Sequence, residues 1–271
     1  MPPAARTDLA RLGRLLELEP AWVRVLPINP IPALFRRGPP GVQLRLLSVL
    51  APKKSDEAAA IIKDLGRAAS WSLQAARIRK RQRPDGTWPV KAPEEPREAA
   101  SQLSMIGLVE NLHALAVLGG HHRWPAVGAG LRALLAFQKP DGRFPLPYQY
   151  QAAIGRLLMA LGQRRTPAVH RAAHWIAERQ RADGGWLYPQ MAGRRTRAPS
   201  CLWTTAEVLA FLARYPTVLI KERLHPAGEF LLQHALEANT TALLPEASAW
   251  DILEEGSRGV RLFHGGTLKV L

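Results

Sequence analysis

A seven-residue motif that occurs three times constrains the fold of this chain more than any other feature of its sequence. Each copy fits the pattern Gln-x-x-Asp-Gly-x-aromatic, and successive copies begin 56 and 42 positions apart. A spacing of this size suits one pair of helices per repeat, so the motif predicts an array of helical hairpins. The three copies are Gln82–Trp88, Gln138–Phe144 and Gln180–Trp186.

The chemistry of the motif predicts a tight turn that follows a helix. Glycine takes a positive φ without steric cost, and an aspartate side chain can bond the backbone close to it. Pro84 and Pro140 stand where the preceding helix must already have ended. We expect the aromatic residue to fold back on the glutamine and the helix end, which makes these positions structural. The predicted turn residues are Gln82, Asp85, Gly86, Trp88, Gln138, Asp141, Gly142, Phe144, Gln180, Asp183, Gly184 and Trp186.

Two kinds of helix alternate along the chain. The helices that lead into the motifs are amphipathic and carry charges, as in residues 172–180. The helices between the motifs are apolar on nearly every side, which is typical of buried helices. They are predicted over residues 101–118, 148–161 and 202–213. An inner layer of buried helices and an outer layer of amphipathic helices is how helical hairpins stack into a ring or a solenoid.

The two ends of the chain differ from this pattern. Residues 1–55 carry no motif and are interpreted as an N-terminal helical cap, while residues 56–271 form the repeat domain. A weaker fourth unit is indicated by Phe230–His234 and by an inner-type helix over Val260–Leu271. Because no polar cap follows that helix, we expect an incomplete ring, either an open arc or a piece of a longer protein, that self-associates through the Val260–Leu271 end.

Charge leaves two interpretations open. The chain has a net charge of +15, and basic proteins attract nucleic acid and anionic membrane surfaces. Arginine outnumbers lysine and the basic residues are spread along the chain, which also fits a solvated basic surface that results from overall composition. The strongest candidate for a polyanion-binding patch is the cluster Arg77, Arg79, Lys80, Arg81 and Arg83.

Cysteine content and hydropathy predict a cytoplasmic protein. Cys201 is the single cysteine, so no disulfide forms within the chain, which suits a reducing compartment. No apolar run approaches the roughly 20 residues that span a bilayer, and the N-terminus has no apolar secretory core. We therefore expect no transmembrane segment.

The motif-bearing turns resemble the QW-type repeats of squalene cyclases and related terpene cyclases, and the hairpins resemble those of protein prenyltransferase β subunits. The resemblance covers residues 56–271. The segments Ala198–Cys201 and Gly228–Leu232 are similar to uncharacterised bacterial squalene-cyclase-like proteins. The resemblance implies an α/α-toroid fold whose ligands enter a central cavity near the N-terminal ends of the inner helices. The residues that would line such a cavity are Tyr148, Cys201, Trp203, Phe263 and His264.

The catalytic motifs of these enzymes are not found in the chain. Squalene-type cyclases protonate an alkene from an Asp-x-Asp-Asp motif, because a poor base needs a strong carboxylic acid donor. The seven aspartates here are widely separated, and the Asp-rich Mg²⁺-binding motif of ionising terpene synthases is equally missing. The catalytic residues therefore stay unassigned.

A zinc site is not expected either. Protein prenyltransferases bind Zn²⁺ through an Asp-x-Cys motif at the start of one inner helix and a histidine at another. Cys201 and His264 occupy comparable positions here, but Pro199 stands where the aspartate is required. Because two ligands do not complete a zinc site, we predict no cofactor.

Three functions remain as hypotheses. The first is a protein that binds or processes an isoprenoid or another apolar lipid, motivated by the apolar inner helices. The alternative is a non-catalytic scaffold whose basic patches bind an anionic partner, either nucleic acid or a membrane surface. A zinc-dependent prenyltransferase that needs a partner subunit is the third, and Pro199 argues against it.

Overall fold

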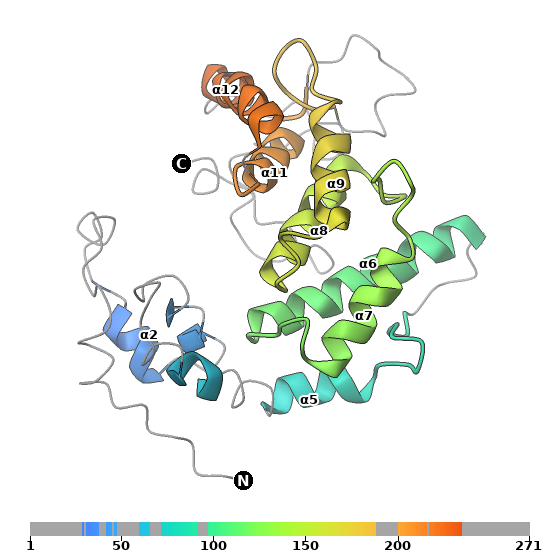
Figure 1. The fold of residues 1–271 in the computed structure, drawn as a ribbon, viewed down its shortest axis with the longest axis vertical. Helices are drawn as coiled ribbons and strands as arrows, with labels where there is room; N and C mark the ends of the chain where they lie inside the picture. The colour runs from blue at the N-terminus through green and yellow to red at the C-terminus, as the bar shows by residue number, and fades with distance from the viewer. Residues whose placement is uncertain are drawn as a thin grey trace, which may run out of the picture.

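The computed structural model is helical throughout the part of the chain that it describes (Figure 1). No strand occurs in these residues, so the all-α prediction is confirmed for them. The described residues are 29, 31–37, 42–44, 46–47, 60–65, 72–90, 97–187, 200–215 and 217–234.

The helices follow the predicted alternation between two types. The three apolar segments form α6, α8 and α11, which contact one another in that order. The amphipathic segments form α5, α7, α9 and α12, and a short helix, α2, lies near the N-terminus. Their bounds are α2 Ile31–Arg37, α5 Leu73–Lys80, α6 Arg97–Val117, α7 Pro125–Leu135, α8 Tyr148–Ala160, α9 Pro167–Ala177, α11 Leu202–Leu212 and α12 Val218–Gln233.

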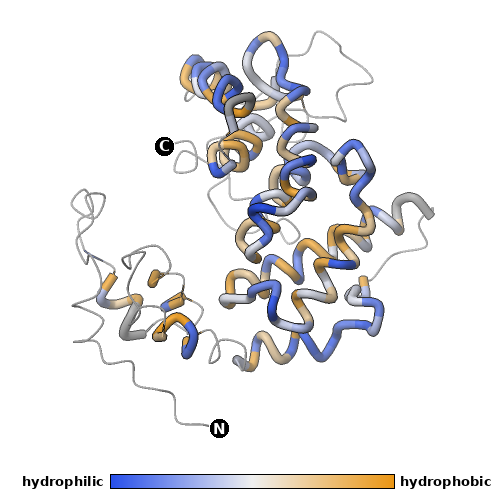
Figure 2. Tube along the Cα trace, viewed as in Figure 1, coloured by the Kyte–Doolittle hydropathy of each residue, from blue (hydrophilic) through white to orange (hydrophobic). Residues whose placement is uncertain are grey.

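The inner helices α6, α8 and α11 form the centre of the main hydrophobic core. Figure 2 shows hydrophobic residues concentrated along these helices, whereas the end of α5 and the turns are hydrophilic. α8 and α11 pack closely against each other. A Cβ atom added at Gly155 would lie 2.3 Å from the ring of Phe211, so a glycine on α8 allows this phenylalanine to fill the space between the two helices.

Short connections at the other end of the layer return the chain from an inner helix to an outer one. Gly119 and Gly162 have φ values of +86° and +88° and follow the ends of α6 and α8, where a glycine commonly closes a helix. The backbone N–H of His122 donates to the carbonyl of Leu161 at 3.0 Å, which joins these two connections. Successive hairpins are therefore tied together at this end as well as through their cores.

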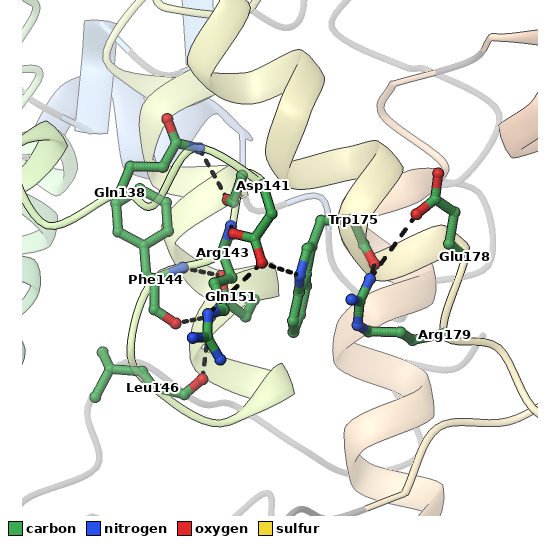
Figure 3. Close-up of polar contacts among 10 residues, drawn as sticks. Gln138, Asp141, Arg143, Phe144, Leu146, Gln151, Trp175, Glu178 and Arg179 are labelled. Atoms are coloured by element: carbon green, nitrogen blue, oxygen red, sulfur yellow. Dashed lines mark hydrogen bonds and ion pairs between the residues drawn. The ribbon is translucent and has the colours of Figure 1, made fainter.

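The three motif copies, here called the repeat turns, share one set of hydrogen bonds, and Figure 3 shows the second of them. In the second repeat turn, Nε2 of Gln138 donates to the carbonyl of Gly142 and to the carbonyl of Ala168 on the next outer helix, both at 2.9 Å. One side chain therefore closes its own turn and binds the following repeat. The equivalent acceptors are Gly86 and Ala126 for Gln82, and Gly184 and Arg223 for Gln180.

The glycine of each repeat turn lies directly against the same outer helix. Gly142 has φ +98°, and a Cβ atom there would lie 2.4 Å from the carbonyl oxygen of Arg171. Arg171 is one helical turn beyond Ala168, so the glutamine and the glycine contact adjacent turns of α9. The same approaches occur between Gly86 and Ala129 at 2.5 Å, and between Gly184 and Pro226 at 2.2 Å.

The aromatic residue of each repeat turn is buried against its own preceding helix. The indole N–H groups of Trp88 and Trp186 donate at 2.8 Å to the carbonyls of Ile78 and Ile176, each ten residues earlier. Phe144 has no such donor. Its backbone N–H instead donates to Oε1 of Gln151 on α8 at 2.9 Å. Tryptophan and phenylalanine can therefore both fill this buried position, and only tryptophan adds a bond to the preceding helix.

A separate small cluster lies near the N-terminus. Ile31, Leu47 and Leu65 are buried together, apart from the main core. Leu65 follows the domain boundary predicted at residue 55, so the described cluster includes residues from both sides of it. The predicted fourth inner helix at Val260–Leu271, and the self-association expected there, lie outside the described residues.

Substitution of Gln138 by alanine should lower the free energy of unfolding by about 1–3 kcal/mol, because the carbonyls of Gly142 and Ala168 both lose their donor. Equilibrium urea unfolding followed by circular dichroism measures this change. Gln74→Ala is the matched control, since Gln74 is exposed at the start of α5. Equal stability losses in the two variants would contradict a special role for the motif glutamine.

Candidate functional site

Buried polar side chains gather where α8 and α11 begin. Each outer helix returns the chain, so the inner helices run in the same direction and their N-terminal ends lie at one end of the layer. Within the described ranges, every buried polar or charged side chain lies on α8, on α11 or directly before α11. These residues are Gln149, Gln151, Ser200, Thr204, Thr205 and Glu207.

Two of these residues hold the repeat turns in place. Nε2 of Gln151 donates to the carbonyl of Leu146 at 3.0 Å, in addition to its bond with the backbone N–H of Phe144. Oγ1 of Thr205 accepts the backbone N–H of Trp186 at 3.0 Å. Both therefore join an inner helix to the turn before it, and their hydrogen bonds explain why they are buried.

Asp183 anchors the start of α11 from the third repeat turn. Its carboxylate accepts the backbone N–H of Ser200 at 3.0 Å, the hydroxyl of Ser200 at 2.7 Å and the backbone N–H of Gly185 at 3.1 Å. Partial burial opposes ionisation, but the hydrogen bonds from Ser200 and Gly185 outweigh it and hold the pKa of Asp183 below its ordinary value. The charged carboxylate is thus part of the folded structure.

An ion pair joins α8 to α11 inside the layer. Nη2 of Arg156 donates to Oε2 of Glu207, whose side chain is completely buried. Burial lowers the pKa of Arg156 to about 10, which leaves the guanidinium charged at neutral pH. A buried carboxylate is stable in such a place only when it is paired and hydrogen-bonded. The charge on each side chain therefore depends on the other.

Two further side chains lie on the same helices with unused hydrogen-bonding capacity. Gln149 is 1% exposed and Thr204 is fully buried, yet Oε1 of Gln149 and Oγ1 of Thr204 have no hydrogen-bond partner within the described residues. Gln149 is two helical turns before Arg156 on one face of α8, and Thr204 is about one turn before Glu207. We call these four residues the α8–α11 seam.

The helix ends add donors to the seam. The first backbone N–H groups of an α-helix have no acceptor within the helix and carry a partial positive charge. Neither α8 nor α11 has an acidic residue in its first turn. At α11, however, the Asp183 carboxylate binds Ser200, and the backbone N–H of Thr204 donates to Sγ of Cys201. The seam thus combines backbone N–H donors at the start of α8 with the hydroxyl of Thr204 and the acceptor oxygen of Gln149. Such a set can bind a group that both donates and accepts hydrogen bonds, such as a hydroxyl or a protonated acid.

Cys201, one of the residues singled out from the sequence, is the N-cap of α11. Its sulfur accepts the backbone N–H of Thr204 at 3.4 Å, and the side chain is 4% exposed. Burial raises the pKa of the Cys201 thiol, which favours the protonated form. Within the described residues, this cysteine therefore has the surroundings of an inert side chain that closes a helix end.

The two aromatic candidates take different positions. Trp203 is half-buried in the first turn of α11 and packs against the core. The ring of Tyr148, the first residue of α8, lies 5.5 Å from the ring of Trp175 on α9, which places Tyr148 toward the outer layer. Phe263 and His264 lie outside the described residues.

Trp175 is also the centre of contacts on the outer side of the array (Figure 3). Its indole N–H donates to Oδ2 of Asp141 at 3.2 Å, and the guanidinium of Arg179 lies 4.0 Å from the ring centroid. Asp141, predicted as a turn residue, thus binds the next outer helix. These contacts are exposed or half-buried, and they hold the second repeat turn against α9.

The described part of the chain contains no group of three or more histidine, cysteine, aspartate or glutamate side chains arranged to hold a metal ion. This finding does not test Cys201 and His264 as a pair of metal ligands, because His264 is not among the described residues. None of the described helices is both long and apolar enough to cross a membrane.

The seam was missed by reasoning from the sequence. Its signal was present, since Arg156 and Glu207 are charged residues inside segments that are otherwise almost entirely apolar. Two opposite charges in two neighbouring inner helices indicate a buried pair. Gln149 and Thr204 carried no comparable signal, because an uncharged polar residue in the first turn of a helix is common.

Removal of one partner of the buried pair should be far more damaging than removal of both. Glu207→Ala leaves the Arg156 guanidinium without its partner and should lower the free energy of unfolding by about 3–5 kcal/mol. The double variant Arg156→Met/Glu207→Leu should lose much less, because no unpaired charge stays buried. Urea unfolding of both variants tests this, and additive losses would contradict it.

The contribution of Asp183 to stability should depend on pH. Because its pKa is lowered in the folded state, its stabilising effect is fully present above the ordinary value of 3.8 and is lost as the pH falls through the folded pKa. The stability gap between the unsubstituted protein and Asp183→Ala should therefore narrow below pH 3.8. Urea unfolding at a series of pH values measures the gap, and a gap that stays constant would show that the charge is unimportant.

Comparison with known proteins gives limited information. No family model matches the chain, and no curated protein matches it. Among solved structures it is similar to the ent-copalyl diphosphate synthase from Streptomyces platensis, with a TM-score of 0.44 and 22% sequence identity. The match covers 71% of this chain and 39% of the synthase chain, so this chain spans well under half of that protein. A similarity of this size carries no argument about activity.

Proposed function

We propose that this protein binds an isoprenoid or another apolar lipid along its inner helices, with the polar group of the ligand at the α8–α11 seam. The proposal concerns binding. The Asp-rich motifs of the cyclases are not in the sequence, and no residue is assigned to a chemical step. Function depends on a site rather than on a fold, so the support must come from the inner helices themselves.

The observation that carries the proposal is the pair of buried polar atoms without partners. Oε1 of Gln149 and Oγ1 of Thr204 lie on neighbouring helices whose other buried side chains are mostly apolar. Unsatisfied buried polar atoms are rare, and binding sites for small molecules typically combine an apolar lining with a few polar groups. A hydroxyl or carboxyl group on a lipid is the kind of group that hydrogen-bonds to such atoms.

The exposed apolar surface of the inner helices supports the same ligand class. Trp203 of α11 is half-buried at the N-terminal end where the seam begins, whereas Val117, the last residue of α6, is 57% exposed at the opposite end of the layer. Figure 2 shows the hydrophobic character of both helices. Apolar side chains on helices that otherwise form the core favour contact with an apolar ligand.

Native mass spectrometry of the purified protein tests the proposal directly. We expect a lipid-sized mass increment, and we expect Gln149→Leu and Thr204→Val to reduce the fraction that carries it. Thr204→Val should change stability little, because it removes a polar atom that has no partner. Thr166→Val is the matched control, since the Thr166 hydroxyl is bonded to the carbonyl of Gln163 at the opposite end of the layer.

A bare polypeptide mass would count against the proposal if added ligands also fail to raise the melting temperature of the protein. Farnesol and a long-chain fatty acid are suitable probes, because each joins an apolar chain to a polar group. No increase in melting temperature with either probe, together with the bare mass, would remove lipid binding as the function.

A further inference from the structure

The end of α5 and the first repeat turn carry an unusual excess of positive charge. The twelve residues 77–88 contain five basic side chains and one acidic side chain, a net charge of +4. Most of the basic side chains are exposed, and Arg79 is half-buried. We call this set the α5 basic face. Its members are Arg77, Arg79, Lys80, Arg81 and Arg83.

The repeat itself does not require this charge. The equivalent segments, aligned on the motif glutamine, are residues 133–144 and 175–186, with net charges of +1 and zero. All three segments form the same turn with the same hydrogen bonds. Because two repeats form this structure without a basic excess, the charge in the first repeat needs another explanation.

Neutralisation by neighbouring acids also differs between the repeats. In the second and third repeats, Arg143 lies 3.6 Å from Asp141, and Arg181 lies 4.0 Å from Asp183. On the α5 basic face, Arg77, Arg79, Lys80 and Arg81 form no ion pair with any described carboxylate. The carboxylate of Asp85 accepts hydrogen bonds from the backbone N–H and the hydroxyl of Thr87, at 2.9 and 2.7 Å. The excess charge is therefore available to a partner.

The apolar residues of this segment point away from the basic face. Ala75 is buried, Ile78 packs against the core, and Trp88 is 2% exposed with its indole N–H bonded to the carbonyl of Ile78. No aromatic ring is exposed between residues 77 and 88, so bases of a single strand have no surface to stack on. Leu73, at the opposite end of α5, is the only strongly exposed apolar residue of that helix.

A membrane surface fits these observations less well than a nucleic-acid duplex. Helices that bind membranes combine cations with an apolar face that enters the lipid, and the apolar side of α5 is used within the protein. Arg77, Lys80 and Arg81 lie on one side of the helix end at i, i+3 and i+4, and they are exposed. Exposed cations with no stacking or inserting group suit phosphate contacts alone. We propose that the α5 basic face binds the phosphate backbone of double-stranded nucleic acid without reading its sequence. This inference is independent of lipid binding at the inner helices.

Fluorescence anisotropy with a labelled DNA duplex of random sequence, and with the RNA duplex of the same sequence, tests the proposal. If about four phosphates are contacted, the affinity should fall on the order of 100-fold between 50 and 200 mM salt. Arg77→Gln/Lys80→Gln/Arg81→Gln should weaken binding at least about tenfold and reduce the salt slope by about three.

The control variant removes the same number of charges elsewhere. Arg132→Gln/Arg164→Gln/Arg165→Gln changes three exposed cations outside the α5 basic face, and it should weaken binding much less. Circular dichroism melting shows whether both variants fold. Equal losses in the two variants would overturn the proposal by showing that net charge alone attracts the duplex. Two other results would also overturn the proposal: no detectable binding to either duplex in low salt, or tighter binding to phosphatidylserine vesicles than to either duplex.

Discussion

The close contact between each repeat turn and the next outer helix is the constraint on which the rest of the array depends. A glycine with positive φ brings its backbone against a helix carbonyl, and the glutamine four residues earlier donates to a carbonyl one turn away on the same helix. Two contacts on adjacent turns fix both the position and the direction of the following helix. The inner helices are then held side by side at a set distance, which allows Phe211 to fill the space over Gly155.

This arrangement separates structural polar groups from those available for function. Gln151, Thr205 and Ser200 are all bonded to the repeat turns or to the segments beside them. The α8–α11 seam is different. Arg156 and Glu207 form an ion pair there, whereas Oε1 of Gln149 and Oγ1 of Thr204 have no hydrogen-bond partner among the described residues. The seam runs from the first turns of α8 and α11 to the ion pair of Arg156 and Glu207 farther along these helices.

The layer pattern and the turns were open to prediction from sequence because both depend on local rules. Hydrophobic periodicity marks the helices, and Asp-Gly after a helix marks a turn. The two-fold bonding of Gln138 to Gly142 and Ala168 was not predictable, since its second acceptor is 30 residues away. The same holds for Arg156 and Glu207, which are 51 residues apart. The position of the Tyr148 ring beside Trp175 was likewise not predictable, because the direction of a side chain depends on the neighbouring helix.

The glutamine and the glycine of each repeat turn contact mainly backbone atoms of the helix that they bind. The glutamine bonds to the carbonyl of an alanine or of Arg223, and the glycine lies against Ala129, Arg171 or Pro226, so these two contacts accept several residue types. In the second repeat turn, the side chains of Arg171 and Trp175 add bonds to Gln138 and Asp141. The contacts of the glutamine and the glycine need only two helix carbonyls that lie one turn apart. The hairpins are thus similar modules: duplication or exchange of a repeat can keep the backbone contacts of the glutamine and the glycine, while side-chain contacts such as that of Trp175 with Asp141 differ between repeats.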